Sequence, residues 1–254
     1  MTDLTDRQLE RYARHVILDE VGEDGQGKLL DAKVLVIGAG GLGAPLLLYL
    51  AAAGIGTLGV IDDDTVDLSN LQRQVIHDEA GVGRPKVESA QKRLRALNPD
   101  IRIEIFETRL TAGNADGIVA SFDIVADGSD NFTTRYLLND VCFRQKKTLV
   151  SAALLRFDAQ LSTFKAHLGA PHPCYRCLFP EQPPEDLVPR CEAAGILGSV
   201  AGVMGALQAT EVLKEVLGLG DSLSGRLLMY DALGPQFREV RFKRDPGCAT
   251  CGQP

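Results

Sequence analysis

The stretch VLVIGAGGLGAPLLLYLAAAGIGTLGVIDDD, residues 34–64, decides the fold. Gly38, Gly40 and Gly43 follow one apolar run and open another, and Asp62 ends a third. Glycines in this setting let the backbone approach a phosphate group, which the N–H groups at the start of a helix then face. An acidic side chain after the second strand can accept hydrogen bonds from ribose hydroxyls. The pattern predicts strand, phosphate turn, helix and strand, and by itself favours a dinucleotide-dependent dehydrogenase.

The segments that follow keep alternating between patterns typical of strands and of helices. Such alternation specifies a mostly parallel sheet with helices on both faces, so the predicted fold class is doubly wound α/β, Rossmann-like. Beyond about Ser151, β-like runs and one long helix over 195–217 predict antiparallel strands that extend the sheet. Strands are expected at 34–38, 57–62, 101–107, 123–127 and 148–153, β-like runs at 159–166, 226–233 and 237–244, and helices at 43–53, 85–97, 112–121 and 131–146.

The chain, residues 1–254, is expected to form a single domain, because no linker rich in Pro, Gly and Ser divides it. A helix is predicted over residues 5–18, where it presents Arg14, and GEDGQGK, residues 22–28, is interpreted as a loop. The expected parts are a helical arm (1–30), a nucleotide-binding part (31–150) and an antiparallel extension with a crossover loop (151–254).

The composition argues against two classes of partner. A net charge of −7 and a pI of about 5.2 create no basic field, so nucleic acid is not expected. Residues 34–61 and 193–210 are long enough to span a bilayer, but their glycine spacing predicts soluble core, so no membrane is expected either. The charged N-terminus lacks the apolar core of a signal peptide, which predicts a cytoplasmic protein with reduced cysteines.

The residues that follow Asp62 do not suit a dehydrogenase. SNLQRQ and GRPK bring Arg73 and Lys86 close to the predicted phosphate turn. Two cations exceed what a dinucleotide needs and suit a triphosphate, whose charge a helix dipole of about half a unit charge cannot neutralise. The alternative is that both residues are ordinary solvated surface charges.

A second polar run, DGSDN, residues 127–131, follows the fourth predicted parallel strand. Open α/β sheets bind their ligands at the carboxyl ends of the strands. A carboxylate such as Asp130 can hold Mg²⁺ between phosphates there. The alternative interpretation makes Asp130 the cap of the following helix, and one side chain can serve both purposes.

The cysteines are unequally arranged. Two CxxC pairs in loops that contain Pro or Gly predict a closed, structural Cys₄ zinc site, whereas a single CxxC pair can be a redox dithiol. Cys191 lies in a Pro-rich acidic loop beside Arg190 and is either a nucleophile or sulfur acceptor or a bystander thiol. Cys142 is expected in the core. The two pairs are Cys174 with Cys177 and Cys248 with Cys251.

Together these motifs resemble a known family. GAGGLG, DDDTVDLSNLQRQ, GRPKVESA, DGSDN, PCYRC, AGILGSVAGVMGALQATEVLK, MYDA and PGCATCG are similar to the ThiF and MoeB adenylyltransferases, relatives of the ubiquitin-activating enzymes. The likeness covers nearly the whole chain. It implies a homodimer that uses ATP and Mg²⁺ to adenylate the C-terminal glycine of a small ubiquitin-fold sulfur carrier protein ending in Gly-Gly. A sulfurtransferase or a cysteine desulfurase is implied as a further partner.

The resemblance also assigns roles to residues. It implies that the turn around Gly41 holds the triphosphate, Asp62 the ribose and Asp130 Mg²⁺. Arg14 is implied to reach the neighbouring subunit's site, and Cys191 to carry a thioester or a persulfide. The implied nucleotide contacts are Gly38, Gly40, Gly41, Gly43, Asp62, Ser69, Asn70, Arg73, Lys86, Asp130 and Asn131, the implied catalytic residues are Arg14, Arg73, Lys86, Asp130 and Cys191, and the implied zinc ligands are Cys174, Cys177, Cys248 and Cys251.

The motifs separate the two subfamilies poorly. MYDA and the short ending are closer to MoeB, which activates a MoaD-like carrier in molybdenum cofactor synthesis. IDDDTVDLSN, CYRCLFPE and the Cys191 loop are as similar to ThiF, which activates a ThiS-like carrier in thiamine thiazole synthesis. Two alternatives of other classes stay open: an NAD-dependent dehydrogenase and a non-catalytic nucleotide-binding scaffold.

Overall fold

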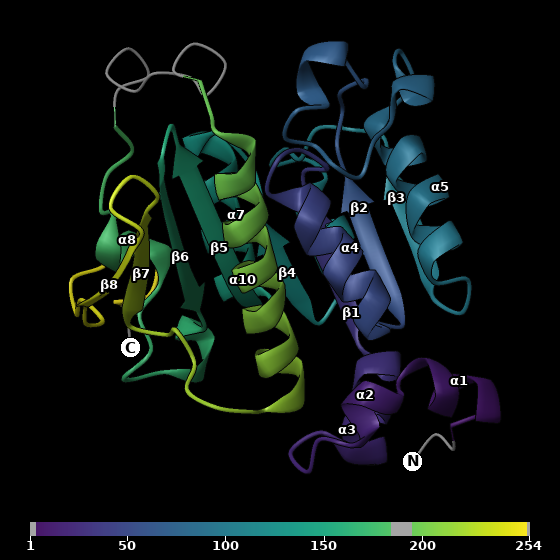
Figure 1. The fold of residues 1–254 in the computed structure, drawn as a ribbon. Helices are drawn as coiled ribbons and strands as arrows, with labels where there is room; N and C mark the ends of the chain where they lie inside the picture. The colour runs from purple at the N-terminus through teal and green to yellow at the C-terminus, as the bar shows by residue number, and fades with distance from the viewer. Residues whose placement is uncertain (1–3, 184–194, 253–254) are drawn as a thin grey trace.

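The computed structural model describes residues 4–183 and 195–252, which are built around one eight-stranded sheet (Figure 1). Its strands are β1 (Lys33–Ile37), β2 (Thr57–Ile61), β3 (Arg102–Phe106), β4 (Ile124–Asp127), β5 (Thr148–Leu155), β6 (Asp158–Phe164), β7 (Arg226–Asp231) and β8 (Gln236–Arg241). The spatial order is β3-β2-β1-β4-β5-β6-β7-β8. Neighbours from β3 to β5 pair in parallel and those from β5 to β8 antiparallel. The predicted parallel sheet with an antiparallel extension is confirmed.

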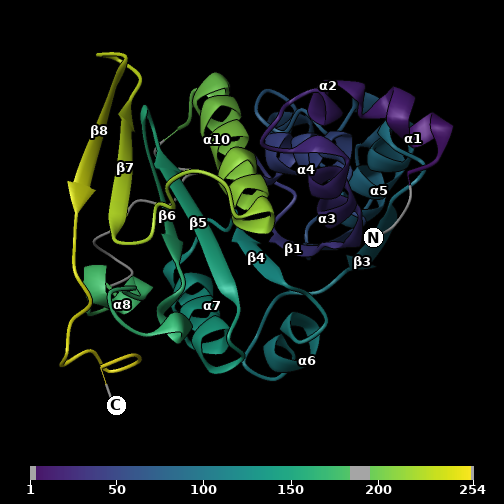
Figure 2. The ribbon, with the colours of Figure 1, turned by 90° about the horizontal axis from the view of Figure 1, so that it is seen from below.

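Helices cover both faces of this sheet. The helices of the described residues are α1 (Asp6–Arg11), α2 (Ala13–Val16), α3 (Gly22–Asp31), α4 (Gly43–Ala53), α5 (Lys86–Leu97), α6 (Ala115–Val119), α7 (Phe132–Arg144), α8 (Tyr175–Leu178) and α10 (Gly198–Leu217), with short 3₁₀ turns η1 (Leu68–Asn70), η2 (Glu79–Gly81) and η3 (Ala166–Leu168). One core cluster joins α4, α5 and α10 to one face, and a second joins α6 and α7 to the other. Figure 2 shows these two layers on opposite sides of the strands.

The strand order places a crevice at the centre of the sheet. From β1 the chain proceeds through α4 to β2 on one side, whereas β4 lies on the other side of β1. The last residues of the two strands, Ile37 and Asp127, are paired in register. Their outgoing segments therefore diverge at one edge, which is the position where open α/β sheets bind ligands.

The two long apolar stretches fold as core, as expected. Residues 34–61 form β1, α4 and β2, and the second stretch enters α10, where Val200, Ala201 and Met204 are buried. Among the residues that the structure describes, no helix is long and apolar enough to cross a membrane.

The predicted loop at residues 22–28 is wrong, because this segment begins helix α3. Its three glycines cost helix stability, about 1 kcal/mol each relative to alanine. Buried contacts offset that cost. Gln26 is fully buried and donates to the carbonyl of Ala53 at 3.0 Å, and Gly25 packs closely against Leu217 of α10. The predicted helix over 5–18 is interrupted at Tyr12, which separates α1 from α2.

Candidate functional site

A cleft of about 1100 Å³ opens at the carboxyl ends of the parallel strands. Four segments form its walls: the glycine turn after β1, the polar segment after β2, the loop after β3 and the run after β4. Leu154, Gln182 and Ile196 extend the wall on the side of the antiparallel strands. Of the implied nucleotide contacts, Gly38, Gly40, Gly41, Asp62, Ser69, Asn70, Arg73, Lys86, Asp130 and Asn131 line it, and Gly43 lies behind the turn at the start of α4.

The glycines of the turn fall into two groups. Gly38 has a φ of 90°, and a Cβ at Gly43 would overlap the carbonyl oxygen of Gly38, so both positions need glycine for the protein's own backbone. At Gly40 and Gly41 a Cβ would meet only ordinary neighbours, at 3.8 and 3.4 Å. These two positions border the cleft, so the space beside them is available to a ligand that approaches the backbone closely.

Asp62 holds the turn in place. One carboxylate oxygen accepts a hydrogen bond from the N–H of Ala39 at 2.8 Å, and the other accepts from the N–H of Asp64 at 2.9 Å. Burial raises the pKa of Asp62 above its usual value, and the nearby charge of Lys86 opposes that rise. The structure thus shows a supporting role for Asp62 in addition to the ribose contact expected from its position.

Lys86 and Arg73 differ in how they are held. Lys86 is the first residue of α5, its side chain is 7% exposed, and its ammonium donates to Asp64 at 2.9 Å. The interpretation of Lys86 as a solvated surface charge is therefore wrong. Arg73 is half-buried and donates to the carbonyl of Ser69 at 3.0 Å, and no carboxylate among the described residues forms an ion pair with it. Its positive charge is available to the cleft.

Ser69 and Asn70 owe their position to a short local turn. Asp67 precedes η1 and accepts a hydrogen bond from the N–H of Ser69 at 2.8 Å. The hydroxyl of Ser69 lowers the pKa of Asp67, and this backbone bond lowers it further. The turn brings Ser69, Asn70 and Arg73 to the same wall of the cleft.

Asp130 is exposed on the opposite wall, after β4. The residue that caps α7 is Asn131, whose side-chain oxygen accepts from the N–H of Thr134 at 2.9 Å, so the interpretation of Asp130 as the helix cap is wrong. Among the described residues, the one hydrogen bond that the Asp130 carboxylate accepts is a long contact of 3.5 Å from the amide of Asn131. A carboxylate so weakly engaged beside a phosphate turn fits the ligand preference of Mg²⁺.

Arg135 was not among the predicted site residues. The structure places it between the cleft and a second, smaller cavity. Arg135 is 8% exposed and donates from one terminal nitrogen to the carbonyl of Ser129 at 2.9 Å, while its Nε meets no acceptor in the described part of the chain. Asp127, the last residue of β4, is fully buried and accepts from Ser129 and Ser151. The available signal was an arginine one helical turn after DGSDN.

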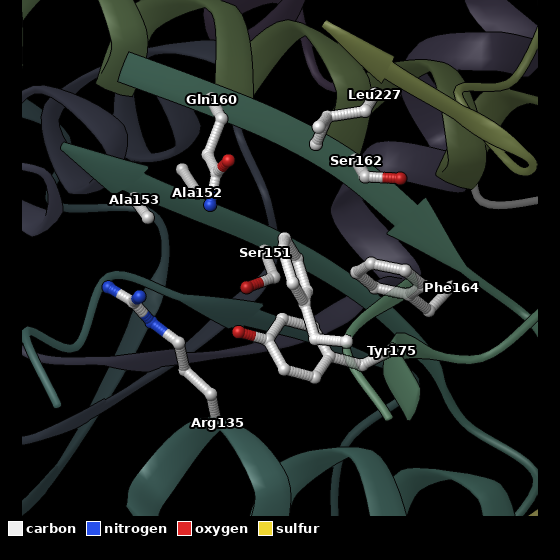
Figure 3. Close-up of a pocket in the computed structure, with 10 residues that line it drawn as sticks. Arg135, Ser151, Ala152, Ala153, Gln160, Ser162, Phe164, Tyr175 and Leu227 are labelled. Atoms are coloured by element: carbon white, nitrogen blue, oxygen red, sulfur yellow. The ribbon is translucent and has the colours of Figure 1, made fainter. Parts of the chain in front are cut away.

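The smaller cavity lies between β5, β6 and the helices α7 and α8 (Figure 3). Its volume is about 10 Å³, which is about the room that one water molecule needs. The Tyr175 hydroxyl and the Arg135 side chain are directed into this region from α8 and α7, below Ser151 and Gln160. Among the described residues the buried Tyr175 hydroxyl also forms no hydrogen bond of ordinary geometry. Burial raises the pKa of this hydroxyl to about 12, and the nearby charge of Arg135 opposes that rise. A water molecule or another oxygen-bearing group in the cavity would satisfy both side chains.

The four paired cysteines converge at the other end of the molecule. The Sγ atoms of Cys174 and Cys248 are 3.5 Å apart, those of Cys177 and Cys251 are 3.3 Å apart, and all four lie within 4.8 Å of one another. Sulfurs that bind tetrahedral zinc at about 2.3 Å lie about 3.8 Å apart, so this donor set fits zinc. Burial raises the pKa of the Cys251 thiol to about 11.

The remaining two cysteines differ from this cluster. Cys142 is 2% exposed in α7, and burial raises the pKa of its thiol, which confirms it as a core residue. Cys191 lies outside the described residues.

Arg14 does not line the cleft. It is exposed on α2, and the helices α1 to α3 gather at the end of the sheet opposite the carboxyl ends of the parallel strands (Figure 1). Within this chain the structure does not bring Arg14 to Arg73, Lys86 or Asp130, which line the cleft.

Comparisons with known proteins agree with this geometry. A model described as the ThiF family matches residues 12–250. The chain is 51% identical over 246 residues to the "SAMP-activating enzyme E1" of Haloferax volcanii, covering 97% of this chain and 90% of that protein. It is 49% identical to the "Sulfur carrier protein adenylyltransferase" of Thermus thermophilus, covering 98% and 92%.

Two further comparisons concern a longer relative and a solved structure. The chain is 50% identical to the bovine "Adenylyltransferase and sulfurtransferase MOCS3", and spans 98% of itself but 54% of that relative. The crystal structure of Escherichia coli MccB with MccA-N7isoASN superposes with a TM-score of 0.83 at 24% identity, covering 99% of this chain and 76% of MccB. At that identity the likeness establishes the fold alone.

Proposed function

Because the chain belongs to the ThiF family, we propose that it is an adenylyltransferase that uses ATP to activate the C-terminal glycine of a ubiquitin-fold sulfur carrier protein. The names of its relatives support this class of reaction. A MoaD-like carrier of molybdenum cofactor synthesis is our first choice of substrate, and a ThiS-like carrier of thiamine synthesis is the alternative.

The observation that carries the proposal is the positive charge around the phosphate turn. Arg73 has no acidic partner among the described residues, and Lys86 is buried beside the same cleft. A dinucleotide's pyrophosphate is served by the turn and the helix dipole, whereas a triphosphate needs further cations. The cleft is therefore better suited to ATP than to NAD.

The proposed contacts follow from where the side chains lie. Gly40 and Gly41 approach the triphosphate, Asp62 the ribose, and Ser69 and Asn70 the wall beside them. Asp130, with Asn131 beside it, would hold Mg²⁺, which supplies charge neutralisation between phosphate oxygens when bound.

The chemistry requires positioning and charge neutralisation rather than a base. The carrier's glycine carboxylate is already ionised, so its oxygen can attack the α-phosphorus, the bond to the bridging oxygen breaks, and pyrophosphate leaves with the electron pair. Arg73 and Lys86 offset the charge that develops on the phosphate oxygens. We propose that Arg135 pairs with the incoming carboxylate, since it is buried beside the cleft with an unpaired nitrogen.

Three further proposals extend beyond one protomer. Arg14 completes the site of the partner subunit in a homodimer, which accounts for its distance from the cleft of its own chain. The four-cysteine cluster binds structural zinc. A sulfurtransferase or cysteine desulfurase supplies sulfur to the activated carrier, with Cys191 as a candidate carrier of a thioester or persulfide.

Pyrophosphate exchange into ATP tests the proposal. With a Gly-Gly-ended carrier of the molybdopterin type, and separately of the thiamine type, the protein should catalyse exchange. Arg73→Ala and Asp130→Ala should each lower the exchange rate by about 10²-fold or more, because each removes a preorganised charge from the transition state. Arg102→Ala is the matched control, since Arg102 is 74% exposed on β3 and pairs with Glu104.

Each outcome separates a competing function. Exchange that persists near the normal rate in both cleft variants contradicts their proposed roles. A protein that binds ATP but never exchanges pyrophosphate with either carrier is a scaffold. Stabilisation against heat by NADH, and not by ATP with Mg²⁺, would favour the dehydrogenase.

A further inference from the structure

His77 is a buried histidine that the proposed chemistry does not use. It is 8% exposed, and it lies between η1 and η2 in the segment that follows β2. Its Nε2 is 2.9 Å from the carbonyl oxygen of Ala39, at the centre of the phosphate turn. Its Nδ1 is 2.9 Å from the hydroxyl oxygen of Ser89 on α5. One imidazole thus connects the turn to the helix that begins with Lys86.

The two contacts determine which ring nitrogen carries the proton. A carbonyl oxygen can only accept, so Nε2 must donate its hydrogen to Ala39. In the neutral ring Nδ1 is then an acceptor, and the Ser89 hydroxyl donates to it. Burial lowers the pKa of His77 below its usual 6.5, the bond to Ala39 opposes that fall, and the charge of Lys86 adds to it. The net lowering favours the neutral form.

The bond to Ala39 also orients the peptide that follows. The Ala39–Gly40 bond is trans, so the Ala39 carbonyl and the Gly40 N–H point in opposite directions. With the carbonyl directed at His77, the Gly40 N–H faces the other way, and Gly40 borders the cleft. Within the described part of the chain this N–H meets no acceptor. The Gly40 N–H can therefore donate a hydrogen bond to a ligand in the cleft.

Ala39 is held from two sides. Asp62 accepts its N–H at 2.8 Å, and His77 donates to its carbonyl at 2.9 Å. The two peptide planes that meet at Ala39 therefore have fixed orientations, which glycines on either side would not supply by themselves.

We propose that His77 is a positioning residue for nucleotide binding: its neutral imidazole orients the Gly40 N–H toward the phosphates and sets the turn at a fixed distance from Lys86. It touches neither the nucleotide nor the carrier. In naming ATP as the ligand, this inference rests on the proposed function.

Two amide substitutions separate the contacts of the ring. His77→Gln places an amide nitrogen near the position of Nε2, from which it can donate to Ala39. His77→Asn places its amide near the position of Nδ1, where it reaches Ser89 but not Ala39. The two variants differ by one methylene and share the polar amide. Ser89→Ala removes only the hydroxyl partner.

Calorimetric titration of the whole protein with ATP and Mg²⁺, without a carrier, measures the effect. His77→Asn should raise the Kd for ATP by about tenfold, the equivalent of one hydrogen bond, and His77→Gln should stay within about threefold of wild type. Ser89→Ala should fall between them. In pyrophosphate exchange the KM for ATP should rise in the same order, with the KM for the carrier unchanged.

The thermal midpoints of the variants distinguish positioning from a merely structural role. The inference is overturned if His77→Asn and His77→Gln bind ATP equally well. It is also overturned if the loss of ATP affinity across the variants is proportional to the loss in Tm and does not depend on whether the contact to Ala39 is kept. Should His77→Asn fail to fold, His77→Gln and Ser89→Ala both still keep a donor to Ala39, so the Kd for ATP must stay below ten times the wild-type value in each; a tenfold rise in either overturns the inference. Because binding is measured without a carrier, a failure of the proposed adenylylation leaves this result readable.

Discussion

The two halves of the sheet are held together in different ways. In the parallel half, β4 is buried at every residue and β1 at all but its first, between helices on both faces. In the antiparallel half, β8 is exposed at every residue, and the segment beyond it returns to the body of the protein through Cys248 and Cys251. A packed core stabilises the first half and reaches β5 and β6 of the second, whose outer strand β8 is exposed and is followed by the cluster of four thiols.

The two halves also differ in how accurately the backbone must be positioned. The cleft depends on the position of the phosphate turn, which is set by Asp62, by His77, by the positive φ of Gly38 and by the close approach of Gly43. The cysteine cluster only has to keep a polypeptide end in place. Besides the thiols, Arg244 donates to the carbonyl of Ala166 at 2.8 Å across the same junction.

The largest effect is expected from removing the metal that the thiols would bind. Cys251→Ala leaves three ligands. If the free zinc concentration is about 1,000 times the Kd of the site, loss of the bound metal lowers the unfolding free energy by about 4 kcal/mol. At about 2–4 °C per kcal/mol for a chain of this length, Tm should fall by about 8–16 °C. Elemental zinc analysis and a thermal scan check this, and ATP affinity should stay within about twofold because the cleft is remote.

Cys142→Ala is the control for this prediction, since it removes another buried thiol, in α7 and outside the cluster. It should keep its zinc and lose only about 1 kcal/mol. Equal losses of Tm in both variants, or wild-type protein without bound zinc, would show that packing and not a metal holds the cluster together.

The intermediate effect tests the opposite half. Gly43→Ala introduces a Cβ that overlaps the Gly38 carbonyl, so the turn or α4 must shift. Overpacking of this kind costs about 1–3 kcal/mol. The Kd for ATP should rise by about tenfold or more, because the turn's N–H groups move away from the phosphates. Zinc content should not change, and calorimetry with zinc analysis on one sample measures both.

Gly117→Ala provides the matched substitution. Gly117 lies in α6, and a Cβ there meets nothing within 4 Å. Alanine should stabilise this helix by about 0.5–1 kcal/mol and leave ATP binding unchanged. If Gly43→Ala behaves in the same way, the close approach of α4 to the turn has no bearing on the site.

Much of the parallel half could be predicted from the sequence, because its signals are local. Apolar runs separated by glycine or polar turns indicate the strands and helices, and the edge of the sheet brings their outgoing residues together. Arg73, Lys86 and Asp130 could therefore be expected near one another, and all three line the cleft. The two CxxC pairs were equally informative, since few arrangements other than a metal site need four cysteines at that spacing.

Other features depend on contacts between distant positions. The sequence shows three glycines in GEDGQGK but not the burial of Gln26, whose bond to Ala53 spans 27 residues and stabilises α3. His77 and Ala39 are 38 residues apart, and no pattern at either position indicates that the ring and the carbonyl meet. Arg135 looks like an ordinary helix residue until α8 and the cavity beside it are in place.

The smallest effect is a pH dependence that belongs to the parallel half alone. The neutral ring of His77 is surrounded by Lys86, whose charge lowers its pKa, and by Asp78, which raises it, with burial as the largest cause of the lowered value. The unfolded chain takes up a proton at this histidine as pH falls through its usual 6.5, whereas the folded protein takes it up only at lower pH. Protons then favour the unfolded state, and the contribution of His77 to stability is present above pH 6.5 and declines as pH falls toward the folded pKa.

Denaturant unfolding of wild type and His77→Gln between pH 8 and 5 isolates this contribution. Both proteins retain His167 and His172, whose pKa values are also lowered by burial, so their effects cancel in the difference. The difference in unfolding free energy should be constant above about pH 7 and shrink below 6.5, by at most about 1.4 kcal/mol per pH unit for one proton. Parallel curves over the whole range would mean that His77 takes up its proton equally well in both states. The imidazole would then take up a proton beside the phosphate turn as readily as in the unfolded chain. His77 would no longer be evidence that the parallel half holds its turn more precisely than the antiparallel half holds its last segment.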